Sequence, residues 1–242
     1  MKKAYKVKNG APYVIMVLPA LLVFVTFFIL PLIFTAKYSF YSWTNFSQEI
    51  TFNGLENYRK IFDDPILAKG IKNTLIFAFV TVTVQSLISL PVSVFLNSKI
   101  KGSNIYRAIY FAPAVLSTLV VGYLWKYLMS SSDYGFINQV LTGMGFEKVN
   151  FLGNAQIALF AIITISVWQW FGWSMVIYLG SLQSISEELY EAASVVGANG
   201  LQKFWHITIP GLAPAIQINF VTSTISRLKI FDLILATTHG GP

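Results

Sequence analysis

The sequence predicts an all-α fold, that of a polytopic α-helical membrane protein with about five transmembrane spans. Its 242 residues are 55% hydrophobic and only 11% charged, whereas soluble domains carry about 25% charged residues. The uncharged stretches are long, and about 20 apolar residues in a helix are enough to cross the hydrocarbon core of a bilayer. The polar connections between them are short, so we expect a single transmembrane domain over residues 1–242.

The composition also excludes several classes of protein. The chain contains no cysteine, which excludes disulfides and thiolate metal sites. The net charge of +7 is typical of basic membrane flanks and does not indicate nucleic-acid binding. The sequence has neither a G-x-x-x-x-G-K-[ST] phosphate loop nor an H-E-x-x-H zinc motif. It also has no hydrophilic stretch long enough for a nucleotide-binding domain, so we expect no metal or cofactor on this chain itself.

The first span is expected over residues 12–36. It lies within 28 uncharged residues, in which Pro19 and Pro31 would kink or end the helix. This run is too long for the apolar part of a signal peptide, and no A-x-A cleavage pattern follows it, so we expect a retained span. Four lysines precede the run and predict a cytoplasmic N-terminus. They are Lys2, Lys3, Lys6 and Lys8.

Spans two and three are expected over residues 73–97 and 106–128. The second lies within 26 uncharged residues. The short connection over 97–107 contains three basic residues and no acid, which is typical of a cytoplasmic loop. The third span follows with 18 uncharged residues, just enough to cross. Polar side chains in these spans, Gln85 among them, are attributed to helix packing.

The fourth and fifth spans are expected over residues 155–182 and 211–236. The fourth lies within 38 uncharged residues. The fifth contains Arg227, Lys229 and Asp232, although a charge at the centre of a span costs about 3 kcal/mol on insertion scales. Two explanations stay open. The three side chains could form a polar lining of a substrate path, or they could lie near the end of a tilted span or in an ion pair, for which Lys229 and Asp232 have suitable i,i+3 spacing.

Residues 184–210 form a strongly polar connection between two long apolar stretches. Ser184 and Glu187 have the spacing of a capping box, in which the serine caps an amide and the glutamate reaches back. Gly197 and Gly200 can each supply the positive φ that ends a helix and turns the chain. The segment is therefore expected to contain a short capped helix, a turn and the start of a second helix.

Small side chains are expected to make the surface of this short helix flat. Ala192 and Ala193 lack bulk, so another protein surface could approach closely. Pro210 lacks an amide hydrogen and suits a first helical turn. The residues alone leave two interpretations open: an interfacial helix and turn that only joins two spans, or a docking element for a partner.

The same segment resembles the EAA loop of binding-protein-dependent ABC importer permeases. In that family the pattern is E-A-A, three residues, a small pair such as G-A, and then I-x-x-P. The matching residues are Glu191, Ala192, Ala193, Gly197, Ala198, Ile207 and Pro210. Two positions depart from the pattern: Ser186, where a proline is common, and Val196, where an aspartate is usual. The resemblance implies a cytoplasmic coupling helix that lies in a groove of an ATPase subunit.

Four further motifs, in order along the chain, resemble the sugar-type members of this family. They are G-L-x-N-Y at 54–58, N-T-L at 73–75, Y-G-x-I-N at 134–138 and F-D followed by G-G-P at 231–242. The resemblance implies the type I importer permease fold, with the third motif in an external loop. Family members usually continue through one more span after G-G-P, so we expect a fragment or a shortened form that lacks the final span.

The resemblance also implies a function. The chain would be the membrane-spanning permease subunit of an ATP-driven importer of the carbohydrate or glycerol-phosphate type, translocating a sugar or related small polar solute by alternating access. Its partners in the cell membrane would be a second, homologous permease, ATPase subunits and an extracytoplasmic solute-binding protein. The chain would not itself be an enzyme, because ATP and Mg²⁺ would bind to the ATPase partner.

Two alternatives come from other classes of protein. An ion-coupled secondary transporter could use Arg227, Lys229 and Asp232 to carry substrate or protons, and it would need no ATPase. A membrane-embedded enzyme would need convergent His, Glu, Asp or Ser groups at one depth, and the chain has only two histidines and very few acids within the apolar stretches.

Overall fold

The computed structural model describes residues 11–42, 50–98 and 100–241, and these residues are mainly helical, as expected. They divide into two compact units, 1–70 and 71–242, and each is described by itself. The first unit contains α1 (Ala11–Phe24), η1 (Val25–Ile29), α2 (Leu30–Tyr38), β1 (Tyr41–Ser42), β2 (Thr51–Phe52), α3 (Glu56–Asp63) and the beginning of α4 (Pro65–Asn97). The four lysines that predict a cytoplasmic N-terminus lie outside the described residues.

The second unit contains the rest of α4 and all the later helices. These are α5 (Ser103–Val115), α6 (Thr118–Leu128), α7 (Phe136–Gly143), α8 (Ala158–Leu182), α9 (Glu187–Val195), α10 (Gly200–Lys203), η2 (Phe204–Thr208), α11 (Ile209–Leu228) and α12 (Asp232–Thr238). The expectation of one transmembrane domain over 1–242 stays a prediction.

The first expected span is a continuous helix made of α1, η1 and α2. Its 27 residues from Pro12 to Tyr38 are long and apolar enough to cross a membrane. The five π-helical residues of η1 end just before Pro31. Proline removes one i→i−4 hydrogen bond and crowds the preceding turn, and a wider π turn relieves that crowding. The helix therefore continues through the proline that the sequence marks as a kink or stop.

The G-L-x-N-Y motif ties the end of this span to α3. The Asn57 Nδ2 donates to the carbonyl oxygens of Ser39 and Tyr41, both at 2.9 Å. The Tyr58 hydroxyl lies 2.7 Å from the Ser39 hydroxyl. Gly54 has a φ of 55°, the left-handed conformation that glycine adopts most readily. These contacts give the motif a local structural role: they hold the beginning of α3 against the chain that leaves the first span.

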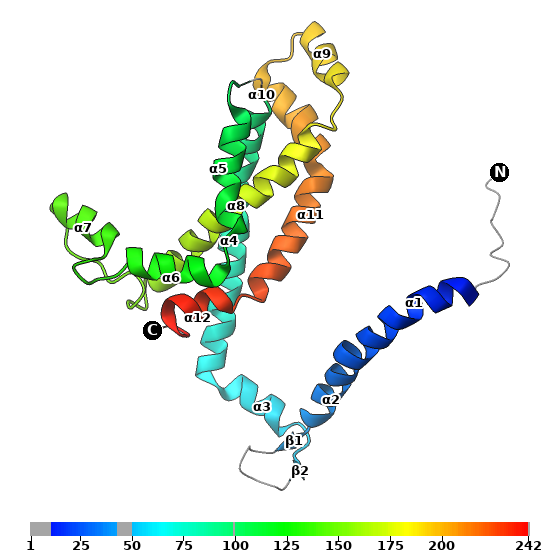
Figure 1. Ribbon diagram of the computed structural model, residues 1–242, viewed down its shortest axis with the longest axis vertical. Helices are drawn as coiled ribbons and strands as arrows, with labels where there is room; N and C mark the ends of the chain where they lie inside the picture. The colour runs from blue at the N-terminus through cyan, green and yellow to red at the C-terminus, as the bar shows by residue number, and fades with distance from the viewer. Residues whose placement is uncertain (1–10, 43–49, 99, 242) are drawn as a thin grey trace. The chain divides into compact units, whose positions relative to one another are not determined.

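Helix α8 is central to the second unit. It packs against α5, α6, α11 and α12, and Figure 1 shows α4, α5, α8 and α11 gathered into one elongated bundle. One buried apolar cluster joins α4, α6, α8 and α12 through Phe77, Val121, Ile165 and Leu233. Buried polar side chains lie in this bundle as well, so its interior is not uniformly apolar.

The expected third span is not one straight helix. Helices α5 and α6 meet at an angle of 96°, with the break at Leu116 and Ser117, just after Pro113. The break leaves backbone carbonyls without helical partners, and Gln169 of α8 donates its Nε2 to the Leu116 carbonyl at 3.2 Å. The expected span over 106–128 therefore stays a prediction, and if α5 and α6 cross together they form a bent span. The bend itself was not predicted, because a proline and a long-range amide contact favour it and periodicity does not reveal it.

The expected fifth span is also interrupted. Helix α11 ends at Leu228 and α12 begins at Asp232, so the helix does not continue through 211–236. Among the described residues, three helices are long and apolar enough to cross a membrane, or four if α5 and α6 form one bent span. Those three are 12–38, 65–97 and 158–182. A fifth crossing by α11 stays a prediction.

Helix α11 is the last part of a longer helical rod. The helical turns of α10, η2 and α11 are continuous, so a single rod extends from Gly200 to Leu228. Its π-helical part, η2, ends just before Pro210. The first span has the same arrangement, in which a π turn precedes a proline.

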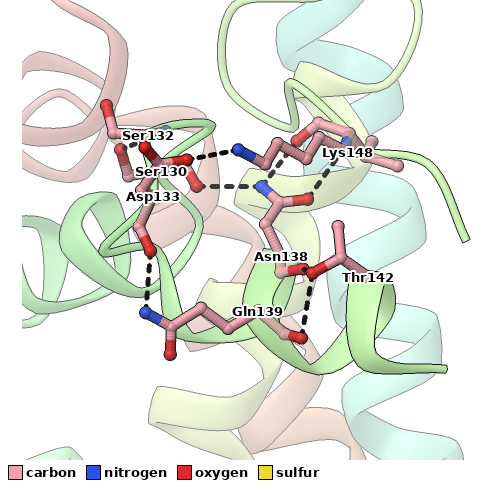
Figure 2. Close-up of polar contacts among 8 residues, drawn as sticks. Ser130, Ser132, Asp133, Asn138, Gln139, Thr142 and Lys148 are labelled. Carbon is pink, nitrogen blue, oxygen red and sulfur yellow. Dashed lines mark hydrogen bonds and ion pairs between the residues drawn. The ribbon is translucent and has the colours of Figure 1, made fainter. Parts of the chain in front are cut away.

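The Y-G-x-I-N motif organises the loop between α6 and α8 (Figure 2). Asn138 is 1% exposed, and its Nδ2 donates to the carbonyl oxygens of Ser130 (2.8 Å) and Val149 (2.9 Å). Its Oδ1 accepts from the Val149 amide at 2.8 Å. A Cβ at Gly135 would overlap the Ser130 carbonyl oxygen. The motif thus fixes a tight turn, and Lys148 pairs with Asp133 across it.

We expect Asn138→Ala to loosen this loop strongly. The change removes three hydrogen bonds, each worth about 0.5–1.5 kcal/mol, and takes away the side-chain partner of the Val149 amide and of the Ser130 carbonyl. The local opening free energy, measured by hydrogen exchange at the Val149 amide, should fall by about 2–4 kcal/mol. Gln139→Ala is the matched control, since Gln139 is exposed and makes one bond, to the Asp133 carbonyl. Equal protection in the two variants would contradict this role for Asn138.

Candidate functional site

The polar segment over 184–210 forms two short helices beyond one end of the bundle (Figure 1). Helix α9 begins after Ser186, whose hydroxyl oxygen accepts from the Glu188 amide at 3.2 Å. Ser184 instead donates to the Ser181 carbonyl, so the predicted capping box of Ser184 and Glu187 is wrong. Ser186 has φ −60° and ψ 132°, a conformation that proline also adopts. Its departure from the family pattern therefore leaves the backbone unchanged.

The turn between α9 and α10 depends on Gly197, as predicted. Gly197 has a φ of 80°, and the Ala198 amide donates to the Ala193 carbonyl at 2.9 Å, which is the usual hydrogen bonding of a left-handed helix end. The same expectation for Gly200 is wrong. Gly200 is the first residue of α10, and the chain enters that helix through a capping box of Asn199 and Gln202.

Side-chain contacts hold α9 against the following rod. The Lys203 Nζ donates to the Ser194 hydroxyl at 2.7 Å, and the Tyr190 and Thr208 hydroxyls lie 3.0 Å apart. Ala193 and Ala198 line a hollow of about 350 Å³ between the two arms of the loop. Ala193 therefore faces the interior of the loop and is half-buried, whereas Ala192 and Glu191 are exposed. The two alanines do not form one flat face.

Apolar side chains on this loop remain exposed. Val195 and Val196, at the end of α9, are 88% and 81% exposed, although they belong to a strongly polar connection. Pro210 lies in the first turn of α11, as predicted. The structure thus places the matching residues of the EAA pattern in one compact loop that presents apolar side chains to its surroundings.

A buried polar network crosses the bundle between α4, α8 and α11. The Gln85 Nε2 donates to the Ser174 hydroxyl (2.6 Å), which donates to Asn219 Oδ1 (2.8 Å). The Asn219 Nδ2 donates to the Tyr178 hydroxyl at 2.8 Å. At the other end, one terminal nitrogen of Arg227 donates to Gln85 Oε1 at 2.9 Å. This network was not predicted from the sequence, in which Gln85 was attributed to helix packing and Asn219 was not singled out.

A cavity of about 250 Å³ lies beside this network. Its lining residues come mainly from the end of α11 and the segment before α12, with contributions from α4, α6 and α8. They include Gln85, Thr118, Trp170, Trp173, Ser226, Arg227, Lys229 and Asp232. The predicted trio of Arg227, Lys229 and Asp232 is therefore brought to one cavity, as a polar lining requires.

The trio does not contain an ion pair. Among the described residues the ion pairs are Lys60 with Glu56 and Lys148 with Asp133, so Lys229 and Asp232 do not form the pair that their spacing would allow. Both of these side chains are exposed, whereas Arg227 is only 6% exposed. Its guanidinium carbon lies 5.6 Å from the centre of the Trp170 ring, within the range of a cation–π contact.

The described residues hold no cluster of three or more His, Cys, Asp or Glu side chains that could bind a metal ion.

Comparison with known proteins shows the family of the chain. A family model, described as the binding-protein-dependent transport system inner membrane component, matches residues 85–241. The chain belongs to this family. The matched region contains both the α9–α10 loop and the Arg227 cavity.

This permease has relatives across most of its length. It is 34% identical, over 94% of its chain and 77% of the relative, to the trehalose/maltose transport system permease protein MalF of Thermococcus litoralis. It is 35% identical, over 90% of its chain and 74% of the relative, to the multiple sugar-binding transport system permease protein MsmF of Streptococcus mutans. The ion-coupled alternative gains no support from these relatives.

The fold of the permease is that of a solved importer. A chain of a bacterial ABC transporter involved in the import of the acidic polysaccharide alginate superposes with a TM-score of 0.82 at 23% identity, over 97% of this chain and 79% of that one. The permease is thus a multi-pass, all-α inner-membrane protein with the type I importer permease fold, and family members of this kind are translocation subunits.

Proposed function

We propose that this permease translocates a sugar or a related small polar solute, and that ATP hydrolysis on a separate ATPase subunit drives the transport. The substrate class is supported by the relatives, which are named as permeases for trehalose/maltose and for multiple sugars. The structure adds a cavity with polar and tryptophan side chains beside a buried polar network. Tryptophan faces and convergent polar groups are suitable for binding a polar ring.

The observation that carries the coupling proposal is the exposed apolar end of α9. Val195 and Val196 are almost fully exposed on a loop that is itself held rigid by caps and tethers. Water is a poor environment for two adjacent valines, so a partner surface that covers them is favoured. We assign that surface to the ATPase subunit, where ATP and Mg²⁺ would bind, with Glu191 to Ala198 as the docking element.

The remaining partners follow from this assignment. A second, homologous permease would complete the translocation path, and an extracytoplasmic solute-binding protein would deliver the solute. The α9–α10 loop would then lie in the cytoplasm. With a cytoplasmic N-terminus, a bent crossing by α5 and α6 and a crossing by α11, the connection over 97–107 would lie on the same side.

We expect Val195→Glu to prevent retention of the ATPase. A charge placed at the centre of an apolar contact is costly to desolvate, so co-purification from membranes should fall at least tenfold. Val140→Glu is the matched control: it makes the same change at an exposed valine of α7, a helix that lies away from the α9–α10 loop (Figure 1). Unchanged ATPase retention in Val195→Glu, with the protein correctly inserted, would refute docking through this surface.

A further inference from the structure

We propose that the cavity beside Arg227 recognises an anionic group, a carboxylate or phosphate, on the transported solute. This inference rests on the proposed function and adds the substrate's charge to it. It starts from the position of one cation. Arg227 is 6% exposed at the end of α11, the expected fifth span, and a charge inside a span costs about 3 kcal/mol unless a partner compensates it.

The described part of the chain does not supply an anionic partner for Arg227. Its two side-chain contacts are neutral: one terminal nitrogen donates to the amide oxygen of Gln85, and the guanidinium lies over the Trp170 ring. The Nε has no hydrogen-bond partner within the described residues. A guanidinium presents several N–H donors in a planar fork that matches two oxygens of a carboxylate or phosphate, so part of its donor capacity is unused.

The charge balance of the cavity also favours an anionic ligand. Its lining contains two cations, Arg227 and Lys229, and one acid, Asp232, which leaves one positive charge in excess. The electrostatic attraction between such a charge and an anion is stronger between low-dielectric walls than in water. A bound anion would balance it, whereas a neutral sugar would leave Arg227 buried and unneutralised.

The cavity geometry suits a small polar ring that carries this anion. The volume of about 250 Å³ is close to the lower end of the roughly 300–1,000 Å³ typical of ligand pockets. Trp170 and Trp173 both line it, and aromatic faces can cover the apolar side of a ring. Gln85 acts as a positioning residue, because it holds Arg227 through one nitrogen while Ser174 holds Gln85.

The test measures solute binding to the permease in lipid nanodiscs by calorimetry, both alone and assembled with its ATPase and second permease. The probes are a neutral disaccharide of glucose, the matching disaccharide of glucuronic acid, and glycerol 3-phosphate. We expect the native protein to bind one or both acidic probes at least tenfold more tightly than the neutral one. The acidic probe that binds more tightly shows whether the site prefers a carboxylate or a phosphate.

Three variants make this test specific. Arg227→Gln should weaken binding of the acidic probe about 10- to 100-fold, the usual cost of losing a charge-assisted hydrogen bond, and change neutral binding little. Gln85→Glu should cause a similar loss while preserving the fold, because its carboxylate would neutralise Arg227 in place. Arg107→Gln is the matched control, since Arg107 contacts the Leu96 carbonyl and does not line the cavity.

Each outcome has a distinct meaning. If the native protein retains the ATPase but binds all three probes equally, the inference is overturned and the proposed function stands. If the acidic preference and its loss in Arg227→Gln are found without ATPase retention, the anion site beside Arg227 stands and the ATPase coupling of the proposed function fails. If Arg227→Gln releases the second permease and the native protein shows no acidic preference, Arg227 pairs with an acid of that subunit and the inference is overturned.

Discussion

Replacing Gly172 with alanine should separate α5 from α8 and destabilise the second unit. A Cβ at this position would overlap the carbonyl oxygen of Tyr110 and come within 2.5 Å of its carbonyl carbon. These are backbone atoms, so no side-chain rotation can relieve the overlap and the helix must move. Overpacking in a core costs about 1–3 kcal/mol, occasionally more, and we expect the upper end of that range or beyond because α5 packs so extensively on α8.

The measurement is the unfolding of the purified protein in mild detergent, followed by tryptophan fluorescence. Gly180→Ala is the matched control, because Gly180 lies on the same helix with no atom within 4 Å of an added Cβ. That variant should be neutral or slightly stabilising, since alanine favours a helix over glycine by about 1 kcal/mol. Similar stability in the two variants would show that α5 and α8 do not approach each other so closely.

Replacing Gln85 with leucine should have the second large effect. Among the described residues, Gln85 is the only side chain that accepts a hydrogen bond from the buried Arg227 guanidinium, and the change removes it. The change also removes the hydrogen bond that Gln85 donates to the Ser174 hydroxyl. A hydrogen bond to a charged group is worth about 1.5–3 kcal/mol, and a neutral one between membrane helices about 0.6 kcal/mol. The free energy of unfolding should therefore fall by about 2–4 kcal/mol.

Ser89→Ala provides the comparison for Gln85→Leu. Ser89 is also buried in α4, one turn further along, but its hydroxyl donates to the Gln85 carbonyl of its own helix. Its loss should cost less than about 1 kcal/mol, because no interhelical contact disappears. Thermal stability in detergent measures both effects. If Ser89→Ala and Gln85→Leu lose equal stability, the network between the helices does not contribute as the contacts suggest.

Much of the fold could be predicted from charge and apolar length alone. Three of the five expected spans appear as helices with the required length. The hydrocarbon core of a bilayer excludes charge, so a long uncharged run in the sequence directly indicates a spanning helix. The bend between α5 and α6 could not be predicted in this way. It depends on Gln169, which is far along the chain and supplies the hydrogen bond that the break requires.

The candidate site was predictable where a single residue carries a local signal. Local chemistry marks the turn at Gly197, and a costly charge marks Arg227 within an apolar stretch. The helix cap at Ser186 was misplaced by two residues, since several serines there can satisfy the same pattern. The contact between Gln85 and Arg227 joins residues 142 positions apart, and no local pattern in one sequence encodes such a distance.

The continuous rod of α10, η2 and α11 has the geometry of a lever arm. Its 29 positions from Gly200 to Leu228 extend about 40 Å at 1.5 Å per residue. One end is fastened to α9 by Lys203 and Thr208, and the other carries Arg227. A tilt of only about 5° about the loop end would swing the far end by roughly 3–4 Å, more than the length of a hydrogen bond. A small rotation imposed on the loop is thus sufficient to pull Arg227 away from Gln85.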